Sequence, residues 1–470
     1  MKKGLLSFCI ESVWPLGEAG ESYRNILRYF YPEFITSLVL YSLLSLLDAR
    51  FIAELRSTSL YATLGVSAVL IHFITKCAEG AAGSITILSG QYNGVGLKDK
   101  AGQAFVDAFW VIMAIGLVVA AALYFGAYYI YALLGVSGKM IHLGVPFLRV
   151  RAIGIFFMFV YLACVAFLRS LKNTKTPMQI FIVGAIFFVI FDYMLIFGVA
   201  GMPKLGLLGS AWATLIQYLV MCSLMLGYIL FDRECRAYSV ALFRPTGGLG
   251  YITKIMSLSW PMIIDKATVA AVYLWLNAMI APMGKYALAS YGIIREMERF
   301  AFLPAIAFAQ IVTFLVSNDF GRKNWDGITN NIKKVILLAG VAVFAILLVF
   351  SLMPAVFIGL FDQKHAFTAF ASSVFPLLSI LVFFDLVQLV LSAALRGAGD
   401  VKIVMWTRVF VVIGFFCPVS YIFSWLAISD QSVKFFFIYA IFYVGSALMS
   451  LVYLLRFRSG AWKGTFKRSE

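Results

Sequence analysis

Charged residues are scarce in this chain. Only 13% of its 470 residues are Asp, Glu, Lys or Arg, whereas 62% are hydrophobic. A soluble domain of this length needs far more charge to cover its surface, so the composition excludes a soluble globular protein. Long apolar runs separated by short polar breaks are typical of a polytopic membrane protein, since about 20 apolar residues span a bilayer as a helix.

Metal-binding and disulfide-forming residues are also few. The chain has three histidines and six cysteines, without CxxC pairing or a Cys/His cluster. We therefore expect neither a metal centre nor disulfides. The sequence contains no GxxxxGK[ST] phosphate-binding loop, which favours an ion gradient over ATP as an energy source. We expect no cofactor. Lys2 and Lys3 precede only a brief apolar stretch, so no cleavable signal peptide is expected.

Twelve apolar runs predict twelve transmembrane helices and an all-α membrane protein. Their approximate limits are 34–55, 60–89, 104–131, 143–168, 178–199, 206–230, 257–281, 287–316, 333–360, 371–395, 402–424 and 433–456.

The net charge of +16 is explained by topology. Most loop lysines and arginines fall on the side of the N-terminus, and Arg396 in the predicted inner loop LRGAGD belongs to them. The opposite loops hold Arg56, Lys139, Lys204, Lys285 and Lys364. The positive-inside rule then predicts a multi-pass protein of the plasma (inner) membrane with both termini in the cytoplasm. The charge is not clustered on one soluble domain, so we expect no nucleic-acid partner.

The two halves of the chain share one plan. Four pairs of stretches match at offsets of 226 to 229 residues, among them PEFITSLV with PMIIDKAT and LRSLKNTKTPM with LRGAGDVKIVM. Six helices per half return the chain to its starting side, so the repeats are parallel. We predict an N-lobe at residues 1–243 and a C-lobe at 244–470. Such repeats favour a transporter with alternating access.

Four aspartates lie inside predicted spans, where a charge costs at least a few kcal/mol and indicates function by default. Asp48 and Asp192 lie roughly 10 Å below the outer surface in the same half and could face one cavity. Two carboxylates in one low-dielectric site cannot both stay ionised cheaply, so one is expected to bind a cation or proton. Asp265 and Asp385 have comparable depths in the second half. The repeat does not duplicate these acids, although pairing with Lys266 or Arg50 is a plainer alternative.

Other charges are candidates to line the same cavity. Lys76 and Glu79 are spaced i,i+3, which predicts an ion pair on one helix face. Glu296 and Arg299 repeat this spacing. Arg295, Glu298 and His72 are further cavity candidates, with structural pairing the plainer alternative. Arg149 and Arg151, near the start of their span, are expected to extend outward to the interface.

Several stretches together resemble the multidrug and toxic compound extrusion (MATE) family. They are LLDARFIAEL (46–55), LRSLKNTKTP (168–177), FDYMLIFGVAGMPKLGLLGSAWAT (191–214) and DLVQLVLSAALRGAGD (385–400). The resemblance implies a two-lobed, twelve-helix antiporter, not an enzyme, that expels amphipathic and often cationic compounds in exchange for H+ or Na+. Asp48 and Asp192 correspond to the family's N-lobe coupling carboxylates, and Asp385 to the C-lobe acid of its sodium-coupled branch.

The chain departs from the family pattern at three positions. Phe188 replaces an asparagine one turn before Asp192, and Leu381 replaces a tyrosine one turn before Asp385. Val269 stands where a helix-7 acid is expected, with Asp265 one turn earlier.

Three alternatives stay open from sequence. A flippase for a lipid-linked saccharide of the same superfamily would use a cationic cavity, for which Arg149, Arg151, Arg295 and Arg299 are available. An intramembrane enzyme would need a convergent catalytic motif, and only the pair Asp48 and Asp192 qualifies. A passive channel would need a ring of filter loops. We expect a small organic substrate, the lipid bilayer as surroundings, and a monomer.

Overall fold

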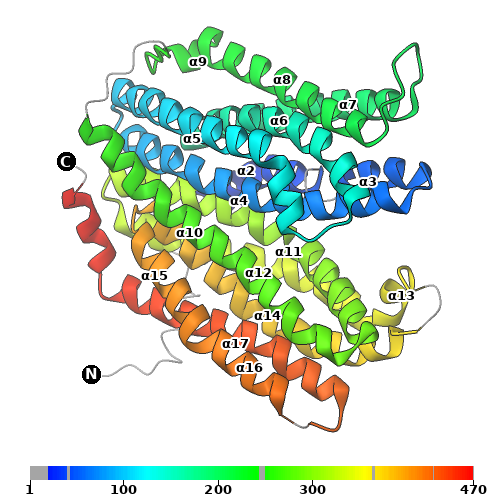
Figure 1. The fold of residues 1–470 in the computed structure, drawn as a ribbon. Helices are drawn as coiled ribbons and strands as arrows, with labels where there is room; N and C mark the ends of the chain where they lie inside the picture. The colour runs from blue at the N-terminus through cyan, green and yellow to red at the C-terminus, as the bar shows by residue number, and fades with distance from the viewer. Residues whose placement is uncertain (1–18, 40–42, 243–248, 363–365, 427, 469–470) are drawn as a thin grey trace, which may run out of the picture. The chain divides into compact units, whose positions relative to one another are not determined.

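The computed structural model describes residues 19–39, 43–242, 249–362, 366–426 and 428–468. These residues form helices throughout, which confirms the predicted all-α class (Figure 1). Eleven of the described helices are long and apolar enough to cross a membrane. The remaining predicted span, 34–55, is described as α2 (Tyr23–Leu38) and α3 (Leu44–Glu54), and residues 40–42 between them lie outside the described ranges. The predicted twelve-helix arrangement is thereby accounted for.

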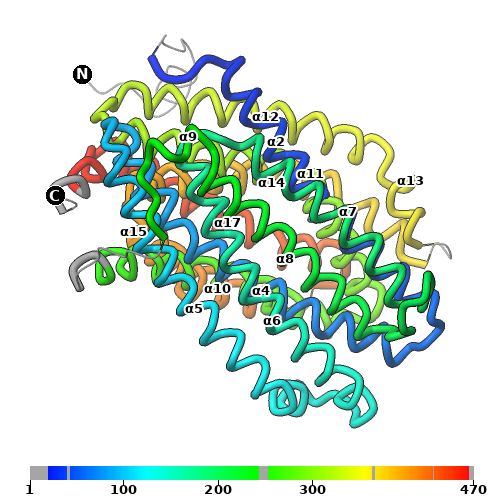
Figure 2. The backbone as a smooth tube through the Cα atoms, turned by 90° about the horizontal axis from the view of Figure 1, so that it is seen from above, coloured from blue at the N-terminus to red at the C-terminus, as the bar shows by residue number. Residues whose placement is uncertain are grey.

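The first compact unit, called unit N here, comprises Tyr31–Ile263. Its long helices are α4 (Thr58–Gly94), α5 (Lys98–Leu133), α6 (Gly138–Ser170), α7 (Lys175–Phe197) and α8 (Leu207–Phe231), followed by the short α9 (Arg233–Arg236). Helix α6 packs against α4, α5 and α8, and α7 lies along α8, as Figure 2 shows. The core of unit N is built from small and aromatic residues on these facing sides, including the stacked rings of Phe105 and Phe167.

The second compact unit, called unit C here, combines the described part of Met1–Phe30 with Ile264–Glu470. Its elements are α11 (Lys285–Gly321), α12 (Trp325–Leu352), α13 (Pro354–Gly359), α14 (Thr368–Gly397), α15 (Val401–Val411), a π-helical turn (Val412–Phe416), α16 (Cys417–Trp425) and α17 (Gln431–Arg458), with 3₁₀ turns at Ala281–Met283 and Ala461–Arg468. Helix α14 packs against α11, α12 and α17. The start of α2 joins this core, where Phe30 stacks on Phe308 with ring centroids 4.2 Å apart.

Two repeat-related helices each contribute to both units. Helix α2 changes unit after Phe30, and α10 (Leu249–Ile280) changes after Ile263. The change falls beside Pro32 in α2 and beside Pro261 in α10, which are matching positions of the repeat. Before Ile264, α10 packs on α4, where Ser259 donates a hydrogen bond to the carbonyl of Ala81. The predicted lobe boundary between residues 243 and 244 lies outside the described residues and stays a prediction.

Local signals in the sequence set several helix ends. Ser57 caps α4 by accepting a hydrogen bond from the Leu60 amide, and Asp430 caps α17 by accepting from Ser432 and Val433. Gly198 ends α7 at a φ of 72°, a left-handed conformation that glycine adopts without strain. The α7–α8 connection is then closed by the Leu205 amide, which donates to the Leu195 carbonyl at 2.8 Å.

The close approach of α7 and α8 depends on Gly209. A Cβ atom at this position would lie 2.7 Å from the carbonyl oxygen of Leu195, which is backbone and cannot turn away. We expect Gly209→Ala to force the two helices apart and destabilise unit N by about 1–3 kcal/mol, the usual cost of overpacking. Thermal unfolding of the purified protein in detergent measures this change.

Gly227 on the same helix provides the matched control, because a Cβ there meets nothing within 4 Å. Gly227→Ala is expected to leave stability unchanged or to raise it by up to about 1 kcal/mol through helix propensity. Equal melting temperatures for the two variants would contradict the packing argument.

Candidate functional site

The two aspartates predicted to share a cavity are brought together in unit N. Asp48 lies on α3, which packs against α7, and Asp192 lies on α7. Their charges interact, and Asp192 is fully buried whereas Asp48 is 9% exposed. Both oxygens of Asp192 and one oxygen of Asp48 are enclosed without a hydrogen-bond partner among the described residues. Two buried carboxylates with unused oxygens are suited to bind a small cation or a proton.

Arg151 of α6 is the cation next to this pair. Its charge acts on both Asp48 and Asp192, and its Nη1 donates a hydrogen bond to the Thr214 hydroxyl. The prediction that Arg151 extends outward to the interface is therefore wrong, because α8 supplies a hydroxyl acceptor inside unit N. The Ser210 hydroxyl, one turn before Thr214, has no partner and adds another oxygen beside Asp48. At the position where the family pattern has asparagine, Phe188 is buried and offers no polar group.

Two ion pairs occupy another part of unit N. Lys76 contacts both oxygens of Glu79 at 2.9 and 3.0 Å, which confirms the pairing expected from their spacing. Arg169 makes a two-pronged contact with Glu33 at 2.6 and 2.7 Å, and Glu33 is almost fully buried. This second pair could not be predicted from local spacing, since its members are 136 residues apart.

Asp265 in unit C is clamped between two arginines. Arg396 donates to its Oδ2 at 2.7 Å, and Arg408 of α15 donates from Nε to its Oδ1. All three side chains are buried. The prediction that Arg396 belongs to an inner loop is thus wrong, because α14 continues to Gly397 and this arginine is buried. Arg408 was missed by sequence reasoning, although it is a charge inside a predicted span and such a charge calls for a partner.

The other two acids of unit C have polar but weaker partners. Asp385 is half-buried and accepts a hydrogen bond from Ser446 of α17 at 2.9 Å, and the charge of Arg408 acts on it. Glu298 is 8% exposed and accepts a hydrogen bond from the Tyr439 hydroxyl. Arg295 lies over the ring of Tyr273, 4.1 Å from its centroid. Leu381 packs in the core near Asp385 and supplies no ligand. The roles of Asp265 and Asp385 as cation ligands stay predictions.

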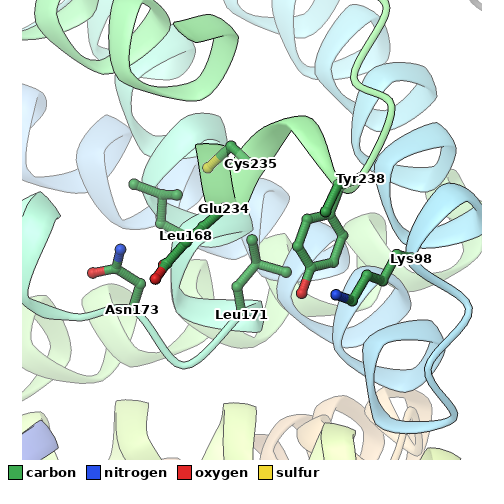
Figure 3. Close-up of a pocket in the computed structure, with 8 residues that line it drawn as sticks. Lys98, Leu168, Leu171, Asn173, Glu234, Cys235 and Tyr238 are labelled. Carbon is green, nitrogen blue, oxygen red and sulfur yellow. The ribbon is translucent and has the colours of Figure 1, made fainter. Parts of the chain in front are cut away.

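A small pocket of about 240 Å³ lies elsewhere in unit N, beside α9 (Figure 3). Lys98, Asn173, Glu234, Cys235 and Tyr238 line it, and the Tyr238 hydroxyl donates to the Asn93 side chain at 2.7 Å. Burial, reinforced by the charges of Asp232 and Glu234, raises the pKa of Cys235 to about 12. Its thiol therefore stays protonated at neutral pH and is a poor nucleophile. The pocket includes none of the predicted site residues. The hydrogen bond from Tyr238 to Asn93 holds the segment after α8 against α4.

Within the described ranges, no group of three or more His, Cys, Asp or Glu residues could hold a metal ion.

Comparison with known proteins identifies the chain. The family model MatE matches residues 34–194 and again residues 261–422. The chain belongs to the MatE family. The two matches begin 227 residues apart, which confirms the internal repeat found in the sequence. Members of the MatE family are transporters and not enzymes, so this chain is a multi-pass membrane transporter.

Curated relatives of this MatE transporter match over most of their length. It is 24% identical to the probable multidrug resistance protein YoeA of Bacillus subtilis (strain 168), over 77% of this chain and 80% of that protein. It is also 24% identical to the multidrug export protein MepA of Staphylococcus saprophyticus, over 76% and 77% of the two chains.

Solved structures share the fold of this MatE transporter. A crystal structure described as MATE in the straight conformation superposes with a TM-score of 0.85 at 17% identity, covering 97% of this chain and 99% of that one. A structure described as a MOP superfamily transporter from Pyrococcus furiosus superposes with a TM-score of 0.85 at 16% identity, covering 97% of this chain and 98% of that one.

The arginine clamp on Asp265 predicts a strong stability effect. We expect Asp265→Asn to destabilise the protein by about 3–5 kcal/mol, because it leaves two buried arginines without their counter-charge. The double variant Asp265→Asn with Arg396→Gln should recover most of this loss, since Arg408 then keeps Asp385 as its neighbour. Thermal unfolding in detergent compares the three proteins. A single variant as stable as the unaltered protein would contradict the clamp.

Proposed function

We propose that this chain is a secondary active exporter of amphipathic, cationic organic compounds, driven by inward flow of H+ or Na+ through alternating access of its two lobes. The observation that carries the proposal is the buried pair Asp48 and Asp192, whose oxygens lack partners. The multidrug resistance and export names of the curated relatives support the substrate class.

Charge balance in unit N supports one exchangeable cation. If both aspartates are ionised, Asp48, Asp192 and Arg151 together carry one unit of uncompensated negative charge. A buried charge without compensation is unfavourable by several kcal/mol, so this state binds a monovalent cation or a proton readily. Arg151 thereby lowers the number of bound cations needed to neutralise Asp48 and Asp192 from two to one.

Coupling follows if the two ligands favour different states of the transporter. A cation bound from outside neutralises the aspartates and favours the inward-open state, and the organic substrate bound from the cytoplasm favours the outward-open state. A membrane potential of about 100 mV contributes about 2.3 kcal/mol per entering charge, which corresponds to roughly 50-fold accumulation. The gradient is therefore sufficient for export. Residence in the plasma membrane with both termini cytoplasmic, and a monomeric state, complete the proposal.

A flippase for a lipid-linked saccharide is less well supported. It would need free arginines to bind a diphosphate, yet three of the four candidate arginines are engaged, and the fourth, Arg149, is exposed and lies over the ring of Tyr124. Arg299 pairs with Glu296 at 2.7 Å, Arg151 lies between Thr214 and the aspartates, and Arg295 lies on Tyr273.

The test is dye efflux from proteoliposomes under an imposed pH gradient, an imposed Na+ gradient, or none. We expect Asp48→Asn and Asp192→Asn each to lower gradient-driven efflux at least tenfold while the protein remains folded, because the neutral amide no longer attracts a cation. One of the two gradients should drive the unaltered protein.

Glu54→Gln is the matched control, since Glu54 lies on the same helix as Asp48 but is exposed and paired with Arg50. It should transport at the unaltered rate. Normal gradient-driven efflux by Asp48→Asn would overturn the assignment, and efflux independent of both gradients would favour the flippase.

A further inference from the structure

Three acids of unit C, Asp265, Asp385 and Glu298, lie within its predicted membrane spans and differ in what neutralises them. Both oxygens of Asp265 contact arginines, and Asp385 has Ser446 and the nearby charge of Arg408. Lys266, beside Asp265 in the chain, adds further positive charge. Glu298 has no lysine or arginine nitrogen within ion-pair distance among the described residues, so its charge has no fixed partner.

The surroundings of Glu298 bring several hydroxyl groups toward it. Helix α17 presents Tyr439, which donates to Oε2, and Tyr443, which lies within electrostatic reach. The opposite oxygen, Oε1, is enclosed without a partner. From α14 the charge of Asp385 acts on Glu298, and from its own helix the charge of Arg295. Helix α12, also packed on α11, has no titratable residue between Val335 and Leu352.

The position of Arg295 shows why Glu298 can exchange a proton. The two residues are spaced i,i+3 on α11 and could pair, yet the guanidinium lies on the ring of Tyr273. A carboxylate buried without a cation is unfavourable, whereas a protonated carboxyl is neutral and keeps its bond from Tyr439. When the proton leaves to water, Arg295 is within reach to replace it as the positive partner.

We propose that Glu298 is the carboxyl group of unit C that takes up and releases a proton during transport, with Arg295 as the cation that replaces the proton. The proton adds to Oε1 and returns to water, and no other bond changes. This inference rests on the proposed coupled export. It also moves the exchange site of unit C from Asp385, where the resemblance placed it, to Glu298 on α11.

The experiment combines infrared spectroscopy of the purified protein with efflux from proteoliposomes. Glu298→Gln is compared with Glu296→Gln, because Glu296 lies on the same helix but is 53% exposed and paired with Arg299. We expect Glu298→Gln to lose one carbonyl-stretch band of a protonated carboxyl group, and to lower efflux driven by a pH gradient at least tenfold. Glu296→Gln should match the unaltered protein in both measurements.

Two further variants separate exchange from a structural role. Glu298→Asp retains a carboxyl group and should keep a shifted band and part of the pH-dependent efflux. Tyr439→Phe removes the hydroxyl donor and should displace the midpoint pH of the band. If Glu298→Gln fails to fold, the titration of the band in these two variants decides the question.

The proposal is overturned if Glu298→Gln retains every protonated-carboxyl band, or if its efflux follows the unaltered pH profile. Efflux of the unaltered protein that ignores both gradients would instead refute coupled export, while the infrared band still reports whether Glu298 binds a proton.

Discussion

The cost of an unpaired charge in a water-poor interior governs this protein. Each acid within the helical units meets that cost in a different way. Asp265 is held by two arginines, and Asp385 accepts a hydrogen bond from a serine hydroxyl near one of them, Arg408. Asp48 and Asp192 share one arginine, and Glu298 lies beside the hydroxyl groups of Tyr439 and Tyr443. The partner decides whether an acid is permanently ionised or free to exchange a cation, so function in this fold depends on the neighbours of each acid.

The fold itself was largely predictable from hydropathy and repetition. A bilayer requires long apolar helices, so the twelve spans could be found without knowledge of any contact. The end of α14 was not predictable in the same way. Arg396 stands beside Gly397 and resembles a loop residue, and only its contact with Asp265, 131 residues away, shows that it points inward. Likewise, helix α2 passes from one unit to the other after Phe30, and α10 does so after Ile263. These changes depend on packing that no local sequence pattern predicts.

The candidate site was predictable in its acids but less so in its bases. Asp48 and Asp192 were found because an acid at a given depth in an apolar run is conspicuous. Arg151 lies near the end of its span, where an arginine usually reaches the interface, so the same reasoning placed it outside. Tyr439 and Ser446 carry no signal in a chain rich in both residue types. Which side chain meets an acid is set by the rotation of each helix, and one sequence does not specify that rotation.

The repeat explains why the two units can differ so much inside. The matched helices and turns secure the fold of each half, and the buried charges are superimposed on that common frame. Because the acids of one half do not recur in the other, replacing one of them does not require a matching change across the repeat. Unit N retains a pair of acids with one arginine, whereas unit C has enough arginines to fix Asp265 and leave Glu298 apart. A duplicated frame with separate charge networks is consistent with the two exchange sites proposed here, a cation site at Asp48 and Asp192 in unit N and a proton site at Glu298 in unit C.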